Sequence, residues 1–201
     1  MENKSGKKAK KILLVGNPNA GKSAVFSRLT GADVISSNYP GSTVELKMGR
    51  AVFCGENYEI IDVPGIYSLE PGSKAEEVAV KIIKEADVIV NVIESTNLER
   101  NLNLTISLIA VKKPMVAVLN FWDETKHTGI EIDPKKIEEK LGIPAIPFCA
   151  ITGEGVTSLC EAVASAKISR FKFPESARWK VIGDTVEYAP NRKPLKKRTR
   201  S

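Results

Sequence analysis

The chain has 201 residues, which is enough for one domain with a small appendage, and 42% of them are hydrophobic, as is ordinary for a globular core. No run of about 18 apolar residues occurs, so we expect no segment that spans a bilayer, and the basic N-terminus has no apolar stretch behind it to suggest a secretory signal. Cys54, Cys149 and Cys160 are far apart. We expect them to be small buried residues in a reducing compartment, which argues against a disulfide scaffold or a zinc site.

The formal net charge of +6 is unevenly distributed. Residues 1–11 carry five lysines and one glutamate, residues 191–201 carry six basic residues and no acid, and residues 12–190 carry 19 basic and 23 acidic residues. The sequence therefore predicts a mildly acidic globule with a disordered basic N-terminus at 1–10 and a basic tail at 190–201. Such tails attract anionic lipid or nucleic acid, and plain solvated ends are an equal alternative.

The first predicted element is a buried strand at residues 11–15, followed by a phosphate-binding motif. Residues 16–23 read Gly-Asn-Pro-Asn-Ala-Gly-Lys-Ser and match G-x-x-x-x-G-K-[ST], and the next residues have helical spacing. The two glycines let several backbone N–H groups face one anion, and the helix presents its positive N-terminal end to the same point. Lys22 is predicted to contact the β and γ phosphates, and Ser23 to ligate Mg²⁺.

Residues 32–45 have neither helical nor strand periodicity and contain Tyr-Pro-Gly at 39–41. A long irregular loop after a phosphate-binding helix is a candidate switch segment, ordered by the γ-phosphate and Mg²⁺. Thr43 is the hydroxyl that we expect on the metal. Residues 45–54 and 58–62 then predict two strands joined by a turn.

Asp62 stands at the end of the second of these strands, in the string Asp-Val-Pro-Gly. Its carboxylate is expected to hold the water shell of Mg²⁺, and Gly65 is expected to offer its backbone N–H to the γ-phosphate because no side chain blocks the approach. The pattern lies about 40 residues after the phosphate loop, which is typical spacing for a GTPase. Residues 63–73 form a second candidate switch segment.

Helices at 74–86 and 97–111 and strands at 87–93 and 114–119 lead to the string Asn-Phe-Trp-Asp at 120–123. Ligands of open α/β sheets lie at such strand ends. The two carboxylate oxygens of Asp123 suit the two N–H donors on one edge of guanine, which adenine lacks. Asn120 is expected to brace the loop and touch the base. Phe121 replaces the usual lysine of this motif, which removes one base contact and leaves an apolar side chain that can pack there.

The remaining predicted elements are a helix within 130–141, a strand at 145–148 and a helix at 155–166. Between the last two, Cys149-Ala150-Ile151 loosely matches an [ST]-A-x loop that offers a backbone N–H to the guanine oxygen. Six strands alternating with helices, with only the second strand antiparallel, predict an α/β fold. The expected architecture is a Ras-like P-loop GTPase domain with a mostly parallel sheet over residues 11–168.

Four strings resemble the N-terminal cytosolic G domain of the FeoB ferrous-iron transporter family, a TrmE–Era–EngA-like group of P-loop GTPases. They are residues 16–23, 38–45, 62–69 and 95–102. The last string, Ser-Thr-Asn-Leu-Glu-Arg-Asn-Leu, has no general G-protein role, and the family also has an apolar residue at the position of Phe121. The likeness covers about residues 10–188, and residues 169–189 resemble the start of the family's helical accessory domain.

The resemblance implies slow hydrolysis of GTP to GDP and phosphate with Mg²⁺. Ile66 occupies the place of the water-orienting glutamine of Ras, and the resemblance implies that a K⁺ ion held by Asn19 supplies a positive charge near the β and γ phosphates. It also implies a cytoplasmic module of ferrous-iron uptake at the inner face of the cell membrane. Its partner would be a separate permease or the rest of a FeoB system, with a nucleotide-dependent homodimer as an open alternative.

The family's polytopic membrane domain does not occur in this sequence, so we expect that the chain does not itself move iron. A piece cut from a longer protein, a separate subunit and a truncated paralogue all stay open. Two other functions also stay open. A ribosome- or RNA-associated GTPase is favoured by the basic tails and disfavoured by the lack of an RNA-binding module and by 6% aromatic content. A nucleotide-sensing module with negligible turnover is compatible with the missing glutamine and the weak base-recognition loops.

The predicted site residues fall into three overlapping groups. The catalytic residues are Lys22, Thr43, Gly65 and Asn19, and the metal ligands are Ser23, Thr43, Asp62 and Asn19. The nucleotide contacts are Gly16, Asn17, Pro18, Asn19, Ala20, Gly21, Lys22, Ser23, Ala24, Asp62, Val63, Pro64, Gly65, Asn120, Asp123, Cys149, Ala150 and Ile151.

Overall fold

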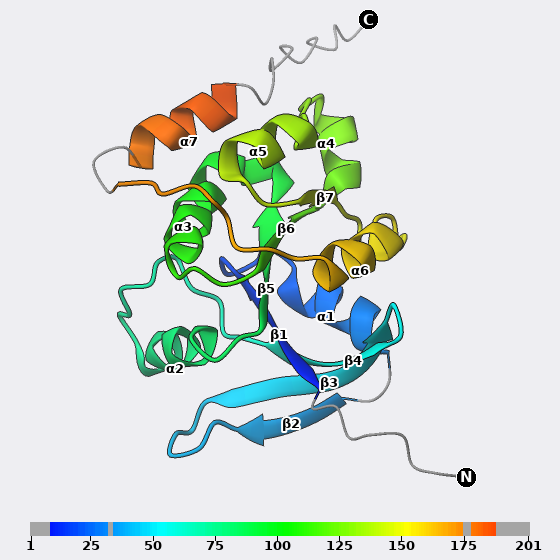
Figure 1. Ribbon diagram of the computed structural model, residues 1–201, viewed down its shortest axis with the longest axis vertical. Helices are drawn as coiled ribbons and strands as arrows, with labels where there is room; N and C mark the ends of the chain where they lie inside the picture. The colour runs from blue at the N-terminus through cyan, green and yellow to red at the C-terminus, as the bar shows by residue number, and fades with distance from the viewer. Residues whose placement is uncertain (1–8, 32–33, 175–177, 188–201) are drawn as a thin grey trace, which may run out of the picture.

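The computed structural model describes residues 9–31, 34–174 and 178–187. At its centre lies a sheet with the strand order β2-β3-β4-β1-β5-β6-β7, flanked by helices (Figure 1). The strands are β1 (Lys10–Gly16), β2 (Val34–Asn38), β3 (Glu45–Phe53), β4 (Glu56–Asp62), β5 (Val88–Glu94), β6 (Met115–Asn120) and β7 (Ala145–Pro147). Among these strands β3 alone points opposite to the rest, because its pairings with β2 and β4 are antiparallel and all the other pairings are parallel. The predicted mostly parallel α/β sheet with one antiparallel strand is therefore confirmed.

The helices in the described part of the chain are α1 (Lys22–Thr30), α2 (Lys74–Ile83), the short 3₁₀ helix η1 (Ser95–Asn97), α3 (Leu98–Ala110), α4 (Trp122–Thr128), α5 (Pro134–Leu141), α6 (Val156–Ala164) and α7 (Arg178–Glu187). Helices α1, α2, α3, α5 and α6 agree closely with the predicted segments. Local signals explain where two of them begin. The Ser73 hydroxyl accepts a hydrogen bond from the Glu76 N–H before α2, and the Asp133 carboxylate caps α5 in the same way.

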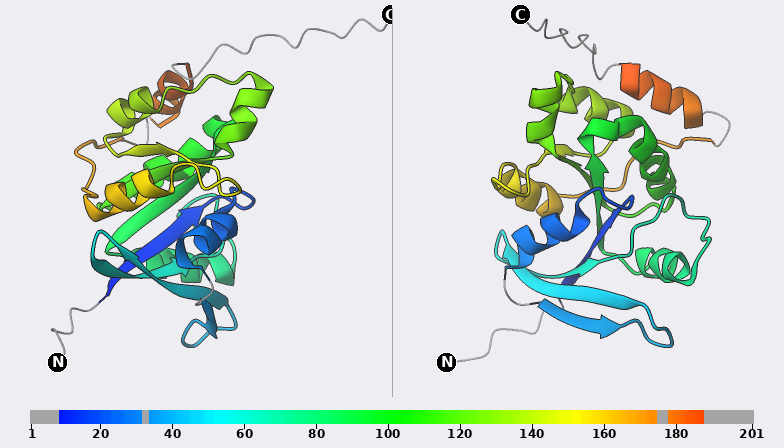
Figure 2. Two further views of the ribbon diagram at one scale, coloured as in Figure 1. Left: turned by 90° about the vertical axis from the view of Figure 1, so that its right-hand side faces the viewer. Right: turned by 180° about the vertical axis from the view of Figure 1, so that it is seen from behind.

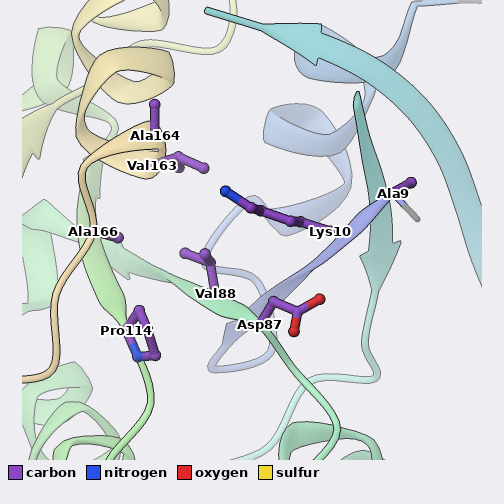
Figure 3. Close-up of a pocket in the computed structure, with 8 residues that line it drawn as sticks. All are labelled: Ala9, Lys10, Asp87, Val88, Pro114, Val163, Ala164 and Ala166. Carbon is purple, nitrogen blue, oxygen red and sulfur yellow. The ribbon is translucent and has the colours of Figure 1, made fainter. Parts of the chain in front are cut away.

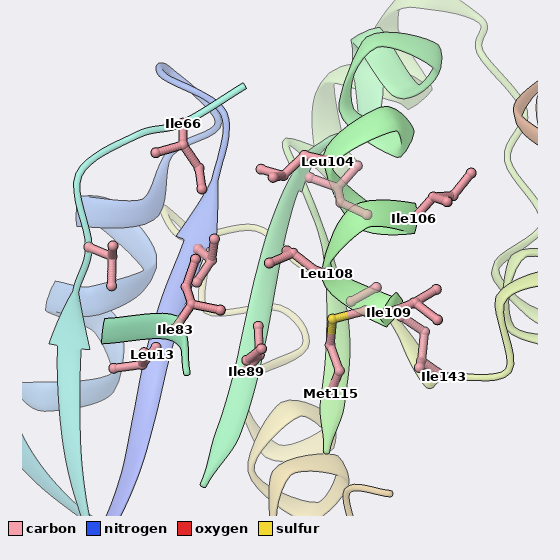
Figure 4. Close-up of a cluster of buried hydrophobic side chains, with 14 of the residues drawn as sticks. Leu13, Ile66, Ile83, Ile89, Leu104, Ile106, Leu108, Ile109, Met115 and Ile143 are labelled. Atoms are coloured by element: carbon pink, nitrogen blue, oxygen red, sulfur yellow. The ribbon is translucent and has the colours of Figure 1, made fainter. Parts of the chain in front are cut away.

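The central strands of the sheet are buried on both faces, and the alternation of side chains along β1 shows how. Leu13 and Val15 belong to one apolar cluster, whereas Ile12 and Leu14 belong to the other. Helices α2, α3 and α5 cover the first face, and α1 and α6 cover the second (Figure 2). Figure 4 shows the first cluster, in which side chains of β1, β5 and β6 meet those of α2 and α3. The central strands are therefore rigid supports for the loops that follow them.

The predicted number of six strands is wrong, because Val34–Asn38 forms a seventh strand inside the segment expected to be irregular. All five of its residues are exposed, so it has no buried face to give the sequence a strand periodicity. It is held instead by antiparallel backbone pairing with β3 along the edge of the sheet. The hairpin is joined by residues 39–44, where the Tyr39 N–H donates to the Val44 carbonyl at 2.8 Å.

The structure also bears on the predictions for Cys54, for the segment after residue 121 and for the two ends of the chain. Cys54 is exposed and not buried as expected, because it lies in the β3–β4 turn with a positive φ of 50°. Helix α4 begins directly after the Asn-Phe-Trp-Asp string and was not predicted. The predicted disordered N-terminus and basic tail lie almost wholly outside the described residues. Among the helices that the structure describes, none has the length and apolar character needed to cross a membrane.

Candidate functional site

The loop between β1 and α1 lies in direct contact with the ends of two neighbouring strands. A Cβ atom on Gly16 would lie 2.3 Å from the Val92 carbonyl oxygen of β5, and one on Gly21 would lie 2.2 Å from the Asn120 side-chain nitrogen at the end of β6. Gly21 also has a φ of 87°, which L side chains rarely adopt. Both glycines of the phosphate motif are therefore required by the packing of this loop.

Lys22 and Asp62 are two charged groups held largely out of solvent at this loop. The Lys22 residue is 8% exposed, and its ammonium group donates to the Gly16 and Asn17 carbonyls at 3.4 Å each. Burial lowers the pKa of Lys22, and the charge of Asp62 opposes this. Burial likewise raises the pKa of Asp62, against the opposing effects of a hydrogen bond from Ser23 and the charge of Lys22.

Ser23 and Asp62 form a direct pair across 39 residues of sequence. The Ser23 hydroxyl donates to Asp62 Oδ2 at 2.8 Å, and Asp62 Oδ1 is buried with no hydrogen-bond partner among the described residues. A hydroxyl and a carboxylate with a spare oxygen form the donor set that Mg²⁺ prefers. The residues present therefore fit a magnesium ion.

The Asn-Phe-Trp-Asp string contacts the phosphate loop from the opposite side. The buried Asn120 amide donates to the Ala20 carbonyl at 3.0 Å. Phe121, with a φ of 60°, lies close enough that a Cβ on Gly21 would be 3.3 Å from its ring. The apolar side chain at the position of the usual lysine therefore packs against the phosphate loop. Asp123 is half-buried in the first turn of α4.

The 149–151 loop is held in place by Arg28 from α1. Its guanidinium donates through Nε to the Ala150 carbonyl at 2.9 Å and through Nη2 to the Ile151 carbonyl. Cys149 is buried, and its N–H donates to the Glu154 carbonyl, whereas Ile151 is 83% exposed. The helix that follows the phosphate loop therefore also fixes the loop predicted to meet the base.

The two candidate switch segments occupy different positions. Gly65 lies against the phosphate loop, since a Cβ there would be 2.9 Å from Pro18 backbone atoms, and the next N–H, of Ile66, donates to the Gly16 carbonyl at 3.2 Å. Thr43 is exposed on the β2–β3 loop and lines a cavity of about 520 Å³ together with Lys74, Glu77 and Lys81 of α2. The structure thus brings Gly65, and not Thr43, to the phosphate loop.

The two asparagines of the loop differ in environment. Asn17 is buried, and its amide donates to the Arg100 carbonyl at 3.5 Å. Asn19 is exposed and has a φ of 68°. Its side-chain oxygen suits a K⁺ ion, and its exposure leaves that oxygen accessible to one.

Sequence reasoning missed Arg28 and a second support, the Asn91–Thr105 pair. The Asn91 amide donates to the Val15 carbonyl at 3.2 Å, and the Thr105 hydroxyl donates to Asn91 Oδ1 at 2.7 Å. This buried chain ties α3 through β5 to the last residues of β1. The signal that could have revealed this bond is Asn91 itself, a polar residue within an otherwise apolar strand.

A separate cavity of about 410 Å³ lies at the amino-terminal ends of β1 and β5 (Figure 3). Its charged residues already have partners: Lys10 pairs with Glu56 at 2.7 Å, and Asp87 accepts from the Lys11 N–H at 2.8 Å. Ligands of such sheets bind at the carboxyl ends of the strands. We therefore assign this cavity a packing role.

The sequence profile of the family described as "Ferrous iron transport protein B" matches residues 10–163. This chain belongs to that family. It is 40% identical over 183 residues to the Fe(2+) transporter FeoB of Legionella pneumophila (strain Lens), which covers 87% of this chain and 24% of the relative. It is also 39% identical over 165 residues to an Fe(2+) transport protein A/Fe(2+) transporter FeoB fusion protein of Porphyromonas gingivalis, which covers 81% of this chain and 20% of the relative. The chain thus spans about a quarter of the first of these relatives.

Solved structures of the ferrous iron transport protein B family share the fold. The cytosolic domain of the T. maritima FeoB transporter in GDP form I has a TM-score of 0.80 at 32% identity, covering 86% of this chain and 71% of that one. A mutant of S. thermophilus NFeoB bound to mGDP has a TM-score of 0.76 at 37% identity, covering 82% and 64%. The Ras-like P-loop GTPase fold predicted from the sequence is therefore confirmed.

The buried carboxylate leads to a prediction on stability. Asp62→Asn should raise the free energy of unfolding of the nucleotide-free protein at pH 7 by on the order of 1 kcal/mol, since an unsatisfied charged group costs more than a neutral one. The folded-state pKa is raised above 3.8, so the folded protein binds more protons, and wild-type stability falls as pH rises from 3.8 through that raised pKa. At pH values above the raised pKa, Asp62 is ionised in the folded protein, and the full loss in free energy of unfolding is present.

Urea unfolding at pH 3.5 and pH 7 measures this difference. The advantage of Asp62→Asn over wild type should be larger at pH 7. Asp87→Asn, at an exposed carboxylate that accepts only a backbone N–H among the described contacts, is the matched control. A loss of stability in Asp62→Asn at pH 7 would contradict the prediction.

Proposed function

We propose that this chain binds guanine nucleotide and hydrolyses GTP to GDP and phosphate with Mg²⁺, as the cytoplasmic module of a ferrous-iron uptake system. The observation that carries the proposal is the convergence of three groups at the carboxyl ends of β1, β4 and β6. These are the phosphate loop, the Ser23–Asp62 pair and the Asn120–Asp123 string. The FeoB structures in GDP, GMPPNP and mGDP forms support the assignment of the ligand.

The residues of the phosphate loop act on the triphosphate by position and charge. Lys22 would exchange its bonds to the Gly16 and Asn17 carbonyls for the β and γ phosphate oxygens. Ser23, Asp62 and Thr43 are the proposed Mg²⁺ ligands, and the bound ion supplies positive charge that offsets the charge developing between the β and γ phosphates. The Gly65 N–H would donate to the γ-phosphate.

Two features of the site account for the proposed slow, K⁺-stimulated turnover. Ile66, at the place of a water-orienting glutamine, is buried in the core, so its side chain orients no water. Asn19 is exposed at the phosphate loop, where a K⁺ ion on its amide oxygen would be a fixed charge near the β and γ phosphates. For Thr43 to reach the metal, the 39–44 loop would have to move away from α2, with which it lines a cavity.

Binding of the base is assigned to Asp123 together with the loop at 149–151. The Asp123 carboxylate would accept the two guanine N–H donors, and a backbone N–H of the loop would donate to the guanine oxygen. The Trp122 N–H donates to the Phe148 carbonyl at 3.2 Å, which ties the two loops together. Both proposed base contacts are therefore positioned from the end of β6.

The cation assignment is tested by GTP hydrolysis with Mg²⁺ in K⁺ and in Na⁺, with ATP as a control. Turnover in K⁺ should exceed that in Na⁺ by roughly tenfold, a conservative share of what one electrostatic stabiliser contributes. Asn19→Ala should remove the difference, and Asn57→Ala, at an exposed asparagine of β4, should keep it. Equal slow rates in both salts with tight GTP binding would instead indicate a nucleotide-sensing module.

The base assignment is tested with Asp123→Asn. This variant should bind GTP about 100-fold more weakly and xanthosine triphosphate more tightly, because an amide cannot accept both guanine N–H donors. Calorimetry with both nucleotides measures the exchange of preference, and Glu124→Gln, at the exposed neighbour, controls for charge. Unchanged GTP affinity in Asp123→Asn would remove Asp123 from the base site.

The two hydrogen bonds from Arg28 to the 149–151 loop, called here the Arg28 clamp, lead to a prediction on nucleotide release. Arg28→Ala should raise the dissociation rate of a fluorescent GDP analogue by about three- to tenfold, because two bonds from a charged but exposed donor are lost. Arg28→Lys should recover little, since one ammonium cannot replace the forked guanidinium. Arg50→Ala, at an exposed arginine on β3, should release the analogue at the wild-type rate. If Arg28→Ala, Arg28→Lys and Arg50→Ala all release the analogue at the wild-type rate, Arg28 has no part in holding the nucleotide.

A further inference from the structure

The string Ser95–Leu102 has no part in the phosphate, metal or base contacts described above, yet it forms a closed structure beside them. It folds as η1 and the first turn of α3. The buried Asn101 side chain fixes this turn, because it accepts from the Glu94 N–H at 3.3 Å and donates to the Asn97 carbonyl at 2.8 Å. This turn therefore has a defined shape that follows directly from the end of β5.

Arg100 connects this turn to two parts of the nucleotide site. Its backbone carbonyl accepts from the Asn17 amide of the phosphate loop at 3.5 Å. Its guanidinium lies over the ring of Tyr67, 4.7 Å from the ring centre. Tyr67 is 44% exposed and stands two residues after Gly65. One residue thus joins the phosphate loop through its main chain and the 63–73 segment through its side chain.

We propose that Arg100 and Tyr67 are positioning residues for GTP hydrolysis: their cation–π contact holds the 63–73 segment so that the Gly65 N–H is aimed at the γ-phosphate. This rests on the proposed GTPase function. Gly65 already lies against Pro18, and the Ile66 N–H is bonded to the Gly16 carbonyl. On the other side of Gly65, the Val63 N–H donates to the Leu14 carbonyl at 3.3 Å. The Arg100–Tyr67 contact fixes the residue after Ile66, so the segment is held both before and after Gly65.

This role predicts an effect on turnover and not on the binding of GDP. If the Gly65 N–H is already in place before the reaction, it stabilises the transition state without any cost of reorganisation. GDP has no γ-phosphate, so the Gly65 N–H makes no such contact with it. A cation–π pair at an exposed site is worth about a two- to fivefold change in rate. Loss of the contact should therefore lower kcat by that factor, with KM for GTP and the affinity for GDP unchanged.

Single-turnover GTP hydrolysis by the 201-residue chain tests the pair in Mg²⁺ and K⁺. Tyr67→Leu and Arg100→Gln should each lower the rate, and the double variant should be no slower than either alone, because both remove one interaction. Tyr67→Phe keeps the ring face and should retain the wild-type rate. Arg100→Lys should recover part of it, and Glu99→Gln, at the exposed neighbour in the same turn, should not change it.

Amide hydrogen exchange at residues 63–73 with a nonhydrolysable GTP analogue supplies a second readout. Exchange should be faster in Tyr67→Leu than in Tyr67→Phe while thermal unfolding is the same. Rates that multiply in the double variant, a faster rate in either single variant, or unchanged rate and exchange would each overturn the proposal. If the wild-type chain binds GTP but does not hydrolyse it, the proposed GTPase function fails, and the exchange difference still decides whether the contact orders this segment.

Discussion

The close approach of the phosphate loop to the ends of β5 and β6 is the constraint on which the rest of the site depends. Gly16 and Gly21 leave no room for a Cβ against the Val92 carbonyl and the Asn120 amide. Interiors packed at this density transmit a displacement from one element to the next. A substitution at Gly21 would therefore displace the phosphate loop from the Asn-Phe-Trp-Asp string, and one at Gly16 would displace it from β5. The loop and the two strand ends thus form one packing unit.

The same packing places Lys22 and Asp62 in a poorly solvated position. Burial disfavours the charged form of both side chains, and the two charges compensate each other only in part. Within the part of the chain that the structure describes, Asp62 Oδ1 has no hydrogen-bond partner. A site that is electrostatically unsatisfied before its ligand arrives is typical of functional sites, because the ligand and its metal supply the missing partners. Such a site lowers the stability of the ligand-free protein and raises its affinity for the ligand.

The predictable parts of the structure are those whose determinants are local in sequence. The phosphate loop, the Asp62 strand end and the buried strands follow from short motifs and apolar runs, and their expected elements are present. Strand β2 was missed because all its residues are exposed and only pairing with β3 holds it. The Arg28 clamp and the Arg100–Tyr67 contact were missed because they join positions over 120 and over 30 residues apart, and no single-sequence pattern links such positions.

The two candidate switch segments, residues 63–73 and the loop at 39–44, are held in different ways. The 63–73 segment is attached to the phosphate loop by the Ile66 N–H and to α3 by Tyr67. The 39–44 loop lies against α2, away from that loop. A ligand shifts a conformational equilibrium only by its differential affinity for the two states. Under the proposed function the segment that carries Gly65 is already in place, so the γ-phosphate and a bound Mg²⁺ would have to move only the loop that carries Thr43. This loop forms one wall of the cavity beside α2, and its Tyr39 and Val44 pack against the apolar core. Contacts of this kind favour the position seen here, so they would oppose the movement that brings Thr43 to the metal.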